Sequence, residues 1–281
     1  MGGSSACRDA STHSEFEKSM NVLVFDIETI PDVDTGRTLL DLGDVPDEDA
    51  ARAMAMALLP NGEAGRRDFM RHHLHKIVAI SAVFRSADRF KCWSLGAPED
   101  DEAALLRHFF DGIERYTPML VSWNGSGFDL PVIHYRALAH GVAAPRYWDT
   151  GRDDRDFKWN NYLSRYHERH TDLMDVLAAY QPRAAASLDQ IAVLCGLPGK
   201  VDMSGAHVFE RYLQGDIKGI RDYCETDVLN TYLVYLRFEF IRGNLTESAY
   251  ADEVQRVRDF LHENSEPHFS RFNEVWDARG A

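Results

Sequence analysis

The feature that most constrains this chain is a short apolar run that ends in two acidic residues. Residues 21–27 read NVLVFDI, and this β-branched and aromatic composition predicts a buried strand. Asp26 and Glu28 stand two positions apart, so on a strand both carboxylates point to the same face. Two unpaired anions there cost on the order of several kcal/mol unless a cation offsets them, and Mg²⁺ or Mn²⁺ suits such oxygen ligands. The alternative is that the strand ends at Ile27 and water solvates Glu28.

A third acid follows a glycine-rich turn. Residues 124–131 read NGSGFDLP and come directly after a short apolar strand predicted at 119–123. A strand, a turn and the start of a helix place Asp129 at the edge of the sheet. Aspartate is also a preferred N-cap residue, and Pro131 suits a first helical turn, so Asp129 could instead cap the helix. The two roles are compatible.

A long helix predicted at 217–242 carries the fourth acid. Asp216 is the expected N-cap and Gly243 the expected C-cap. Tyr223 and Asp227 are four residues apart and therefore share one helical face. The alternative is that Tyr223 packs in the core while Asp227 is an ordinary surface acid.

The remaining pattern places strands early and helices late. Further strands are predicted at 77–84 and 90–95, and further helices at 50–59, 101–116, 130–140, 172–180, 188–195 and 206–213. This order predicts an α/β sheet whose first strands form an antiparallel meander. Residues 1–19 are expected to be a flexible leader or residues added to the protein. The tail after 244 is expected to be helical, with Val254, Val257 and Leu261 on a face that docks on the body or on a partner.

Composition excludes several classes of protein. The 281 residues suffice for one sizeable domain, and the net charge of −14 argues against broad, nonspecific coating of nucleic acid. The sequence shows neither a membrane-length apolar stretch nor a secretion signal, and its four cysteines form no CxxC pair. We therefore expect a soluble, cytoplasmic protein with no membrane partner.

Together, these acids and the tyrosine resemble the DEDDy 3′–5′ exonucleases of the RNase-H-like superfamily. More closely, the chain resembles stand-alone predicted exonucleases related to the proofreading domain of family B DNA polymerases. The matching motifs are Asp26-x-Glu28, then Asn124-x(3)-Phe128-Asp129, then Tyr223-x(3)-Asp227, with further likeness at 170–175 and 187–200. The resemblance covers roughly 21–243. It implies an exonuclease domain at 20–243, a helical C-terminal tail at 244–281, and an RNase-H-like mixed five-stranded sheet flanked by helices.

The resemblance also implies a reaction and its ligands. Two divalent metal ions, Mg²⁺ or Mn²⁺, would drive hydrolysis of single-stranded DNA or RNA from the 3′ end, releasing nucleoside monophosphates. Asp26 would bridge both ions, Glu28 and Asp227 would complete one, and Asp129 would serve the other. Tyr223 would orient the attacking water, because a tyrosine pKa near 10 makes it a poor base at neutral pH.

Several other residues are candidates for substrate contact. The resemblance implies such a role for Thr29, Asn124 and Phe128, although Asn124 could brace its turn and Phe128 could pack in the core. Arg66, Arg67, Arg71, His72, His73, His75 and Lys76 form a basic run that either is a solvated loop or contacts substrate phosphates. The aromatic and basic segment 144–170 either holds a single strand or folds over the core.

Two other functions are compatible with parts of the pattern. A haloacid-dehalogenase-type phosphatase also has an aspartate after its first strand, but it needs a second aspartate where this chain has Glu28. A non-catalytic nucleic-acid-binding module with a relic metal site is the other alternative. The presence of all four acids and Tyr223 counts against it. The sequence identifies no polymerase or repair partner.

Overall fold

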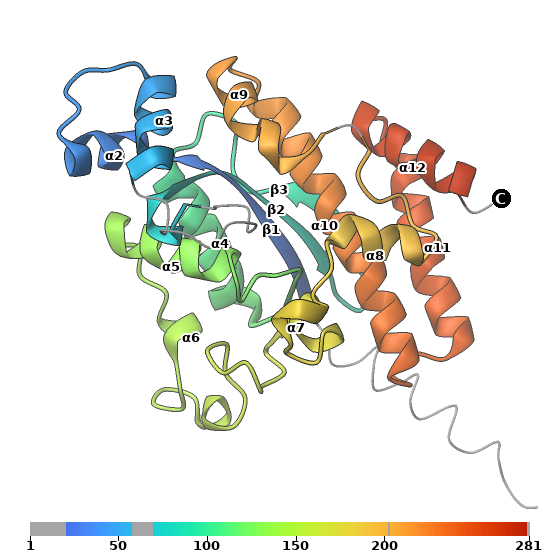
Figure 1. The fold of residues 1–281 in the computed structure, drawn as a ribbon. Helices are drawn as coiled ribbons and strands as arrows, with labels where there is room; N and C mark the ends of the chain where they lie inside the picture. The colour runs from blue at the N-terminus through green and yellow to red at the C-terminus, as the bar shows by residue number, and fades with distance from the viewer. Residues whose placement is uncertain (1–20, 58–69, 202, 280–281) are drawn as a thin grey trace, which may run out of the picture.

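The centre of the molecule is a mixed five-stranded sheet with the order β3-β2-β1-β4-β5 (Figure 1). The computed structural model describes residues 21–57, 70–201 and 203–279. The strands are β1 (Val22–Pro31), β2 (His75–Arg85), β3 (Phe90–Ser94), β4 (Met119–Ser122) and β5 (His170–Asp172). β1, β2 and β3 pair antiparallel, as the predicted meander requires, whereas β4 and β5 add in parallel beside β1. The predicted α/β class, a mixed five-stranded sheet flanked by helices, is confirmed.

Helices cover both faces of this sheet (Figure 1). The α-helices are α2 (Val33–Leu40), α3 (Asp47–Ala57), α4 (Glu102–Tyr116), α5 (Asp129–His140), α6 (Pro145–Trp148), α7 (Leu173–Leu177), α8 (Leu188–Leu194), α9 (Val208–Leu213), α10 (Ile217–Ile241), α11 (Glu247–Glu263) and α12 (Pro267–Arg279). Short 3₁₀ turns are η1 (His72–Leu74), η2 (Arg155–Lys158), η3 (Pro182–Ala184) and η4 (Gly205–His207). Within the described ranges, no helix combines the length and the apolar character that crossing a membrane requires.

The central strand β1 divides the core in two. Successive residues on a strand point to opposite faces, so Val24 enters the cluster around α10 and Phe25 enters the cluster around α4 and α5. Asp26 and Glu28 follow Val24 on the same face. The alternation of the strand therefore presents both acids to α10.

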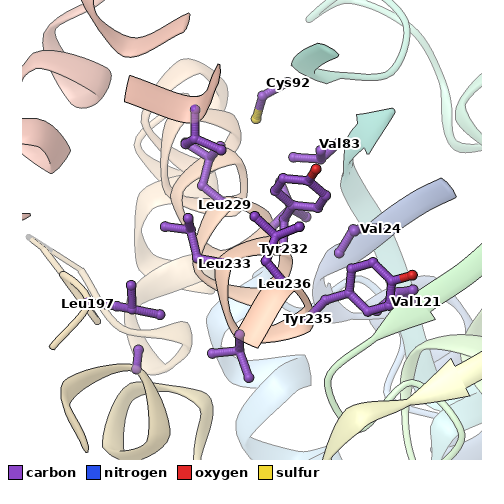
Figure 2. Close-up of a cluster of buried hydrophobic side chains, with 14 of the residues drawn as sticks. Val24, Val83, Cys92, Val121, Leu197, Leu229, Tyr232, Leu233, Tyr235 and Leu236 are labelled. Atoms are coloured by element: carbon purple, nitrogen blue, oxygen red, sulfur yellow. The ribbon is translucent and has the colours of Figure 1, made fainter. Parts of the chain in front are cut away.

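The long helix α10 lies against that face of the sheet and carries much of the core. Figure 2 shows apolar side chains of α10 beside those of three strands: Leu229, Tyr232, Leu233, Tyr235, Leu236, Val24, Val83 and Val121. Burying a side chain of this size contributes about 1.5–3 kcal/mol relative to leaving it exposed. Asp216 accepts a hydrogen bond from Gly219 N at 2.9 Å, so the predicted N-cap is confirmed. The helix ends one residue earlier than predicted: Arg242 is the C-cap, and Gly243 follows it with φ +80°.

The C-terminal tail docks on this core. α11 packs against α10 and β3, and α12 packs against α10 and α11. The Arg85 guanidinium forms a two-pronged, buried ion pair with Glu253 of α11, and Tyr232 donates to the same carboxylate at 2.9 Å. The prediction that the tail helix docks on the body is confirmed, with Val257 and Leu261 buried as its apolar spacing indicated.

The structure differs from the sequence-based expectations for elements at three places. β1 continues to Pro31, so Glu28 lies on the strand, and the alternative that the strand ends at Ile27 does not hold. The helix expected at 172–180 is the shorter α7: Asp172 belongs to β5 and caps the helix, and the left-handed φ of Ala179 (+49°) and Tyr180 (+59°) is incompatible with its continuing to residue 180. A three-residue strand carries too little alternation to be seen in a sequence. α2 was not expected at all.

The aromatic segment 144–170 mainly completes the core. Tyr147, Phe157 and Tyr162 are buried in the cluster with α4 and α5, and Tyr162 donates to the Pro118 carbonyl at 2.7 Å. Its other three tryptophan and tyrosine rings, Trp148, Trp159 and Tyr166, remain exposed. The predicted leader at 1–19, together with Arg66 and Arg67, lies outside the described residues.

Candidate functional site

The first two acids of the site, Asp26 and Glu28, lie on β1 opposite small residues of β2. Asp26 lies opposite Ser81 of β2 and Glu28 opposite Ala79, and paired residues share a face of the sheet. Both neighbours are small, so the carboxylates are not crowded by β2. A β-bulge follows between Glu28 and Thr29, a feature common beside active sites because it redirects side chains.

The turn after β4 has a conformation that its glycines permit. Asn124 adopts a left-handed φ of +65°, and its carbonyl accepts hydrogen bonds from Gly127 N at 3.0 Å and Phe128 N at 2.9 Å. A Cβ at Gly125 would collide with the Ser122 side chain, and one at Gly127 would collide with the Asn124 side chain. Asn124 therefore braces this turn through its backbone.

The turn delivers Asp129 to β1. Its Oδ1 accepts a hydrogen bond from Ile27 N at 3.1 Å, between the two acids of the first motif. Pairing between β1 and β4 has already ended at Val24, so this backbone donor is available to a side chain. The alternative that Asp129 caps α5 does not hold: Phe128 occupies the cap position, where no side-chain cap bond forms, and the Asp129 carboxylate binds β1.

α10 brings the third motif to the same place. Tyr223 is buried and hydrogen-bonds the half-buried Asp227. Between them, Cys224 points its thiol at the Asp26 carbonyl, 3.5 Å away, and at Asp26 Oδ2, 3.7 Å away. One ligand atom each from Asp26, Glu28 and Cys224 lies within 4.8 Å of the others. The sequence patterns assigned Cys224 no role in the site, because the four cysteines of the chain form no paired motif.

Burial raises the proton affinity of all four carboxylates, and neighbouring acids of the site add to this effect at Asp26 and Glu28. Burial, followed by the charges of Asp129, Glu28 and Asp227, raises the pKa of Asp26 well above its ordinary value. Burial, then Asp227 and Asp129, does the same to the pKa of Glu28. Burial raises the pKa of Asp129 to about 7 and that of Asp227 to about 6. All four acids therefore lie within electrostatic reach of one another.

The donor set fits divalent metal ions. Among the described residues, none of the four carboxylates forms an ion pair with lysine, arginine or histidine. Buried carboxylates without a counterion are costly, and an all-oxygen set is what Mg²⁺ and Mn²⁺ prefer. Burial and the charges of Asp227 and Glu28 also raise the pKa of Tyr223 far above its usual range, so its hydroxyl stays protonated at neutral pH.

Lys200 lies next to the site, and the sequence patterns assigned no role to this residue. Its segment is pinned to α10, because Gly199 and the Asn230 side chain exchange hydrogen bonds of 3.1 and 2.9 Å. Lys200 Nζ lies 5.7 Å from the centre of the Tyr223 ring, and its charge lowers the pKa of both Glu28 and Asp227. The likeness at 187–200 was the only signal that could have found it.

The predicted substrate contacts surround the acids. Thr29 Oγ1 hydrogen-bonds His75 Nδ1 at 2.9 Å, one residue after Glu28. Phe128 is half-buried, and the His75 ring meets it edge-on at 5.1 Å. The described part of the basic run therefore lies against both acidic motifs. Burial in this position lowers the pKa of His75.

The sequence matches a known family over most of its length. Residues 67–276 match the family described as a predicted 3′–5′ exonuclease related to the exonuclease domain of PolB. Asp129, Tyr223 and Asp227 fall inside the matched residues. Asp26 and Glu28 precede them, so their membership of the site rests on the geometry alone.

Two curated proteins are similar to parts of the chain. A DNA polymerase of Archaeoglobus fulgidus is 23% identical over 137 residues, covering 48% of this chain and 17% of the polymerase. A catalytic polypeptide of DNA polymerase epsilon from Schizosaccharomyces pombe is 27% identical over 145 residues, covering 50% of this chain and 6% of that polypeptide. The chain thus spans a small fraction of the length of the relatives it matches.

Proposed function

This chain belongs to the family of predicted 3′–5′ exonucleases related to the exonuclease domain of PolB, and on that premise we propose that it uses two divalent metal ions to release nucleoside monophosphates from the 3′ end of single-stranded DNA or RNA. One observation carries the proposal. Asp26, Glu28, Asp129 and Asp227 converge from β1, α5 and α10, and no ion-paired side chain among the described residues neutralises them.

The four carboxylates would bind the ions, and neighbouring protein groups would fix the carboxylates in position. When bound, Mg²⁺ or Mn²⁺ activates water and stabilises charge on the leaving oxygen. The Cys224 thiol and the Ile27 amide fix the carboxylates of Asp26 and Asp129 from the protein side. These contacts pre-organise the site, so little reorganisation is needed when substrate arrives.

Tyr223 would orient water rather than remove its proton. A general base must be deprotonated near neutral pH, and the raised pKa of Tyr223 keeps its hydroxyl protonated. A protonated hydroxyl that is positioned by Asp227 can donate to or orient an attacking water. Thr29, Asn124 and Phe128 lie around the same acids, which supports their proposed contact with the terminal nucleotide.

An end-labelled oligonucleotide tests the proposal. A 5′-labelled single strand, in DNA and RNA versions, should shorten stepwise from its 3′ end with Mg²⁺ or Mn²⁺ and stay intact with EDTA. Asp26→Asn should lower the rate at least about a hundredfold, since lost metal ligation costs several kcal/mol of transition-state stabilisation. Asp34→Asn, at an acid 81% exposed on α2, is the matched control and should keep the wild-type rate.

Two outcomes would contradict the proposal. Hydrolysis that persists in EDTA, or in Asp26→Asn, would remove the metal assignment. A wild-type protein that binds the oligonucleotide but never shortens it would instead favour the relic binding module.

A further inference from the structure

A short basic turn, residues 70–76, connects the two acidic motifs of the site. His75 hydrogen-bonds Thr29, the residue after Glu28, at 2.9 Å. His72 Nε2 lies 2.8 Å from the Gly127 carbonyl, two residues before Asp129. The inner side of the turn is thus fixed to both motifs at once, so its outer side keeps a defined position beside the acids.

The outer side of the turn presents a cation and aromatic rings. Arg71 and His73 are exposed on it. The His73 ring meets the ring of Tyr135 edge-on, with 5.9 Å between the centres. Tyr135 stands on α5, the helix that begins at Asp129, and is 48% exposed. We call Arg71, His73 and Tyr135 the outer surface of the turn.

This combination matches what a single strand of nucleic acid offers. Its phosphates seek cations, and its bases have π-faces that stack on aromatic rings whatever their identity. The chain as a whole carries −14, and its catalytic acids repel phosphate. A strand that threads toward those acids therefore needs cations close by, and Arg71 is an exposed cation next to His72, which is held on the Gly127 carbonyl.

We propose that the outer surface of the turn binds the single strand on the 5′ side of the scissile phosphodiester, with Arg71 on a backbone phosphate and Tyr135 against a base. The inference rests on the proposed exonuclease function. His72 and His75 act as positioning residues, because their side chains are occupied by Gly127 and Thr29. The surface adds affinity for longer substrates and takes no part in the bond cleavage.

Two substrates separate this role from catalysis. The p-nitrophenyl ester of thymidine 5′-monophosphate has a cleavable phosphodiester and no upstream nucleotide, whereas a twelve-residue oligonucleotide has the full strand. Arg71→Ala and Tyr135→Ala should each raise KM for the oligonucleotide about tenfold, in line with typical single-base stacking and phosphate contacts. Both variants should leave kcat and KM for the ester within about twofold of wild type.

Matched controls keep the test specific. Arg89→Ala removes an exposed arginine from the turn at the opposite end of β2, and Tyr135→Phe keeps the ring. Both should behave as wild type on both substrates. Wild-type oligonucleotide KM in Arg71→Ala and Tyr135→Ala would overturn the inference, as would equal losses on both substrates. Wild type that hydrolyses neither substrate would overturn the proposed function and this inference with it.

Discussion

At the residue scale, the four carboxylates cost the metal-free protein stability. Burial raises the pKa of Asp129 to about 7 and that of Asp227 to about 6, against about 4 for an unfolded aspartate. Between those pH values the folded state retains protons that the unfolded state has released. The contribution of these groups to stability is therefore present below about pH 4 and is lost as the pH rises through their folded pKa values.

This loss of stability with rising pH predicts how the metal-free Asp129→Asn variant behaves in EDTA. The amide oxygen can still accept from Ile27 N, but it carries no charge. The Tm of Asp129→Asn minus that of wild type should therefore be larger at pH 8 than at pH 5. Thermal unfolding at both pH values measures it, and a difference that is the same at both would contradict the pKa shifts.

The same carboxylates predict how metal ions stabilise the fold. Ions bind the deprotonated acids and not the unfolded chain, so Mn²⁺ should raise the Tm of wild type more at pH 8 than at pH 5. Asp26→Asn should lose most of this rise, whereas the exposed Asp34→Asn should keep it. An equal rise in all three proteins would place the ions elsewhere.

Tyr223→Phe tests the role of a single hydroxyl. The ring stays in its buried position, and only the hydrogen bond to Asp227 and the group facing water are lost. We expect kcat to fall by roughly ten- to a hundredfold while KM and Tm change little, since positioned groups of this kind contribute at this scale or above. A steady-state assay with wild-type kcat would remove Tyr223 from the mechanism.

At the scale of elements, β1 and α10 were visible in the sequence because both are long and are buried over most of their length. β5 was not, because three residues carry no period, and its pairing with β4 depends on contacts across 48 positions of sequence, as between Ser122 and His170. The cap role for Asp129 failed for a related reason. The residues next to Asp129 in the sequence favour a helix cap. The backbone donor that its carboxylate binds in the structure, Ile27 N, lies 102 positions away in the sequence.

The turn between β4 and α5 gives a prediction at this scale. Gly125→Ala should lower stability by about 1–3 kcal/mol and reduce activity, because the new Cβ collides with Ser122, which His170 holds through a 2.8 Å hydrogen bond. Gly112→Ala on α4 is the control: its Cβ meets nothing within 4 Å, and it should stabilise by about 0.5–1 kcal/mol. Urea unfolding of both variants checks the pair, and a neutral Gly125→Ala would contradict the account of the turn.

At the scale of the whole molecule, the sequence predicted the class of the sheet and the antiparallel meander of its first three strands, but not how the chain after 244 joins it. The Arg85–Glu253 pair links β2 to α11 across 168 positions, and no local signal in the sequence pairs those two residues. The division between a domain at 20–243 and a tail stays a prediction. The apolar contacts of α11 and α12 make the tail part of the core around α10.

The ion pair between Arg85 and Glu253 makes a measurable contribution to the docking of the tail. Glu253→Gln removes the charge that holds Arg85 and leaves a buried guanidinium poorly paired, so we expect a loss of about 3–5 kcal/mol. Glu263→Gln, at an exposed acid near the end of α11, should be neutral. Urea unfolding compares the two, and equal stabilities would show that α11 does not depend on this pair.

The central claim is that Asp26, Glu28, Asp129 and Asp227 together hold two divalent ions. Anomalous diffraction from crystals grown with Mn²⁺ and a nucleoside 5′-monophosphate tests it most directly. We expect two manganese peaks about 3.5–4 Å apart, bound by these four carboxylates, and none at those positions in Asp26→Asn crystals. No manganese peak at these carboxylates, or peaks that persist unchanged in Asp26→Asn, would contradict it.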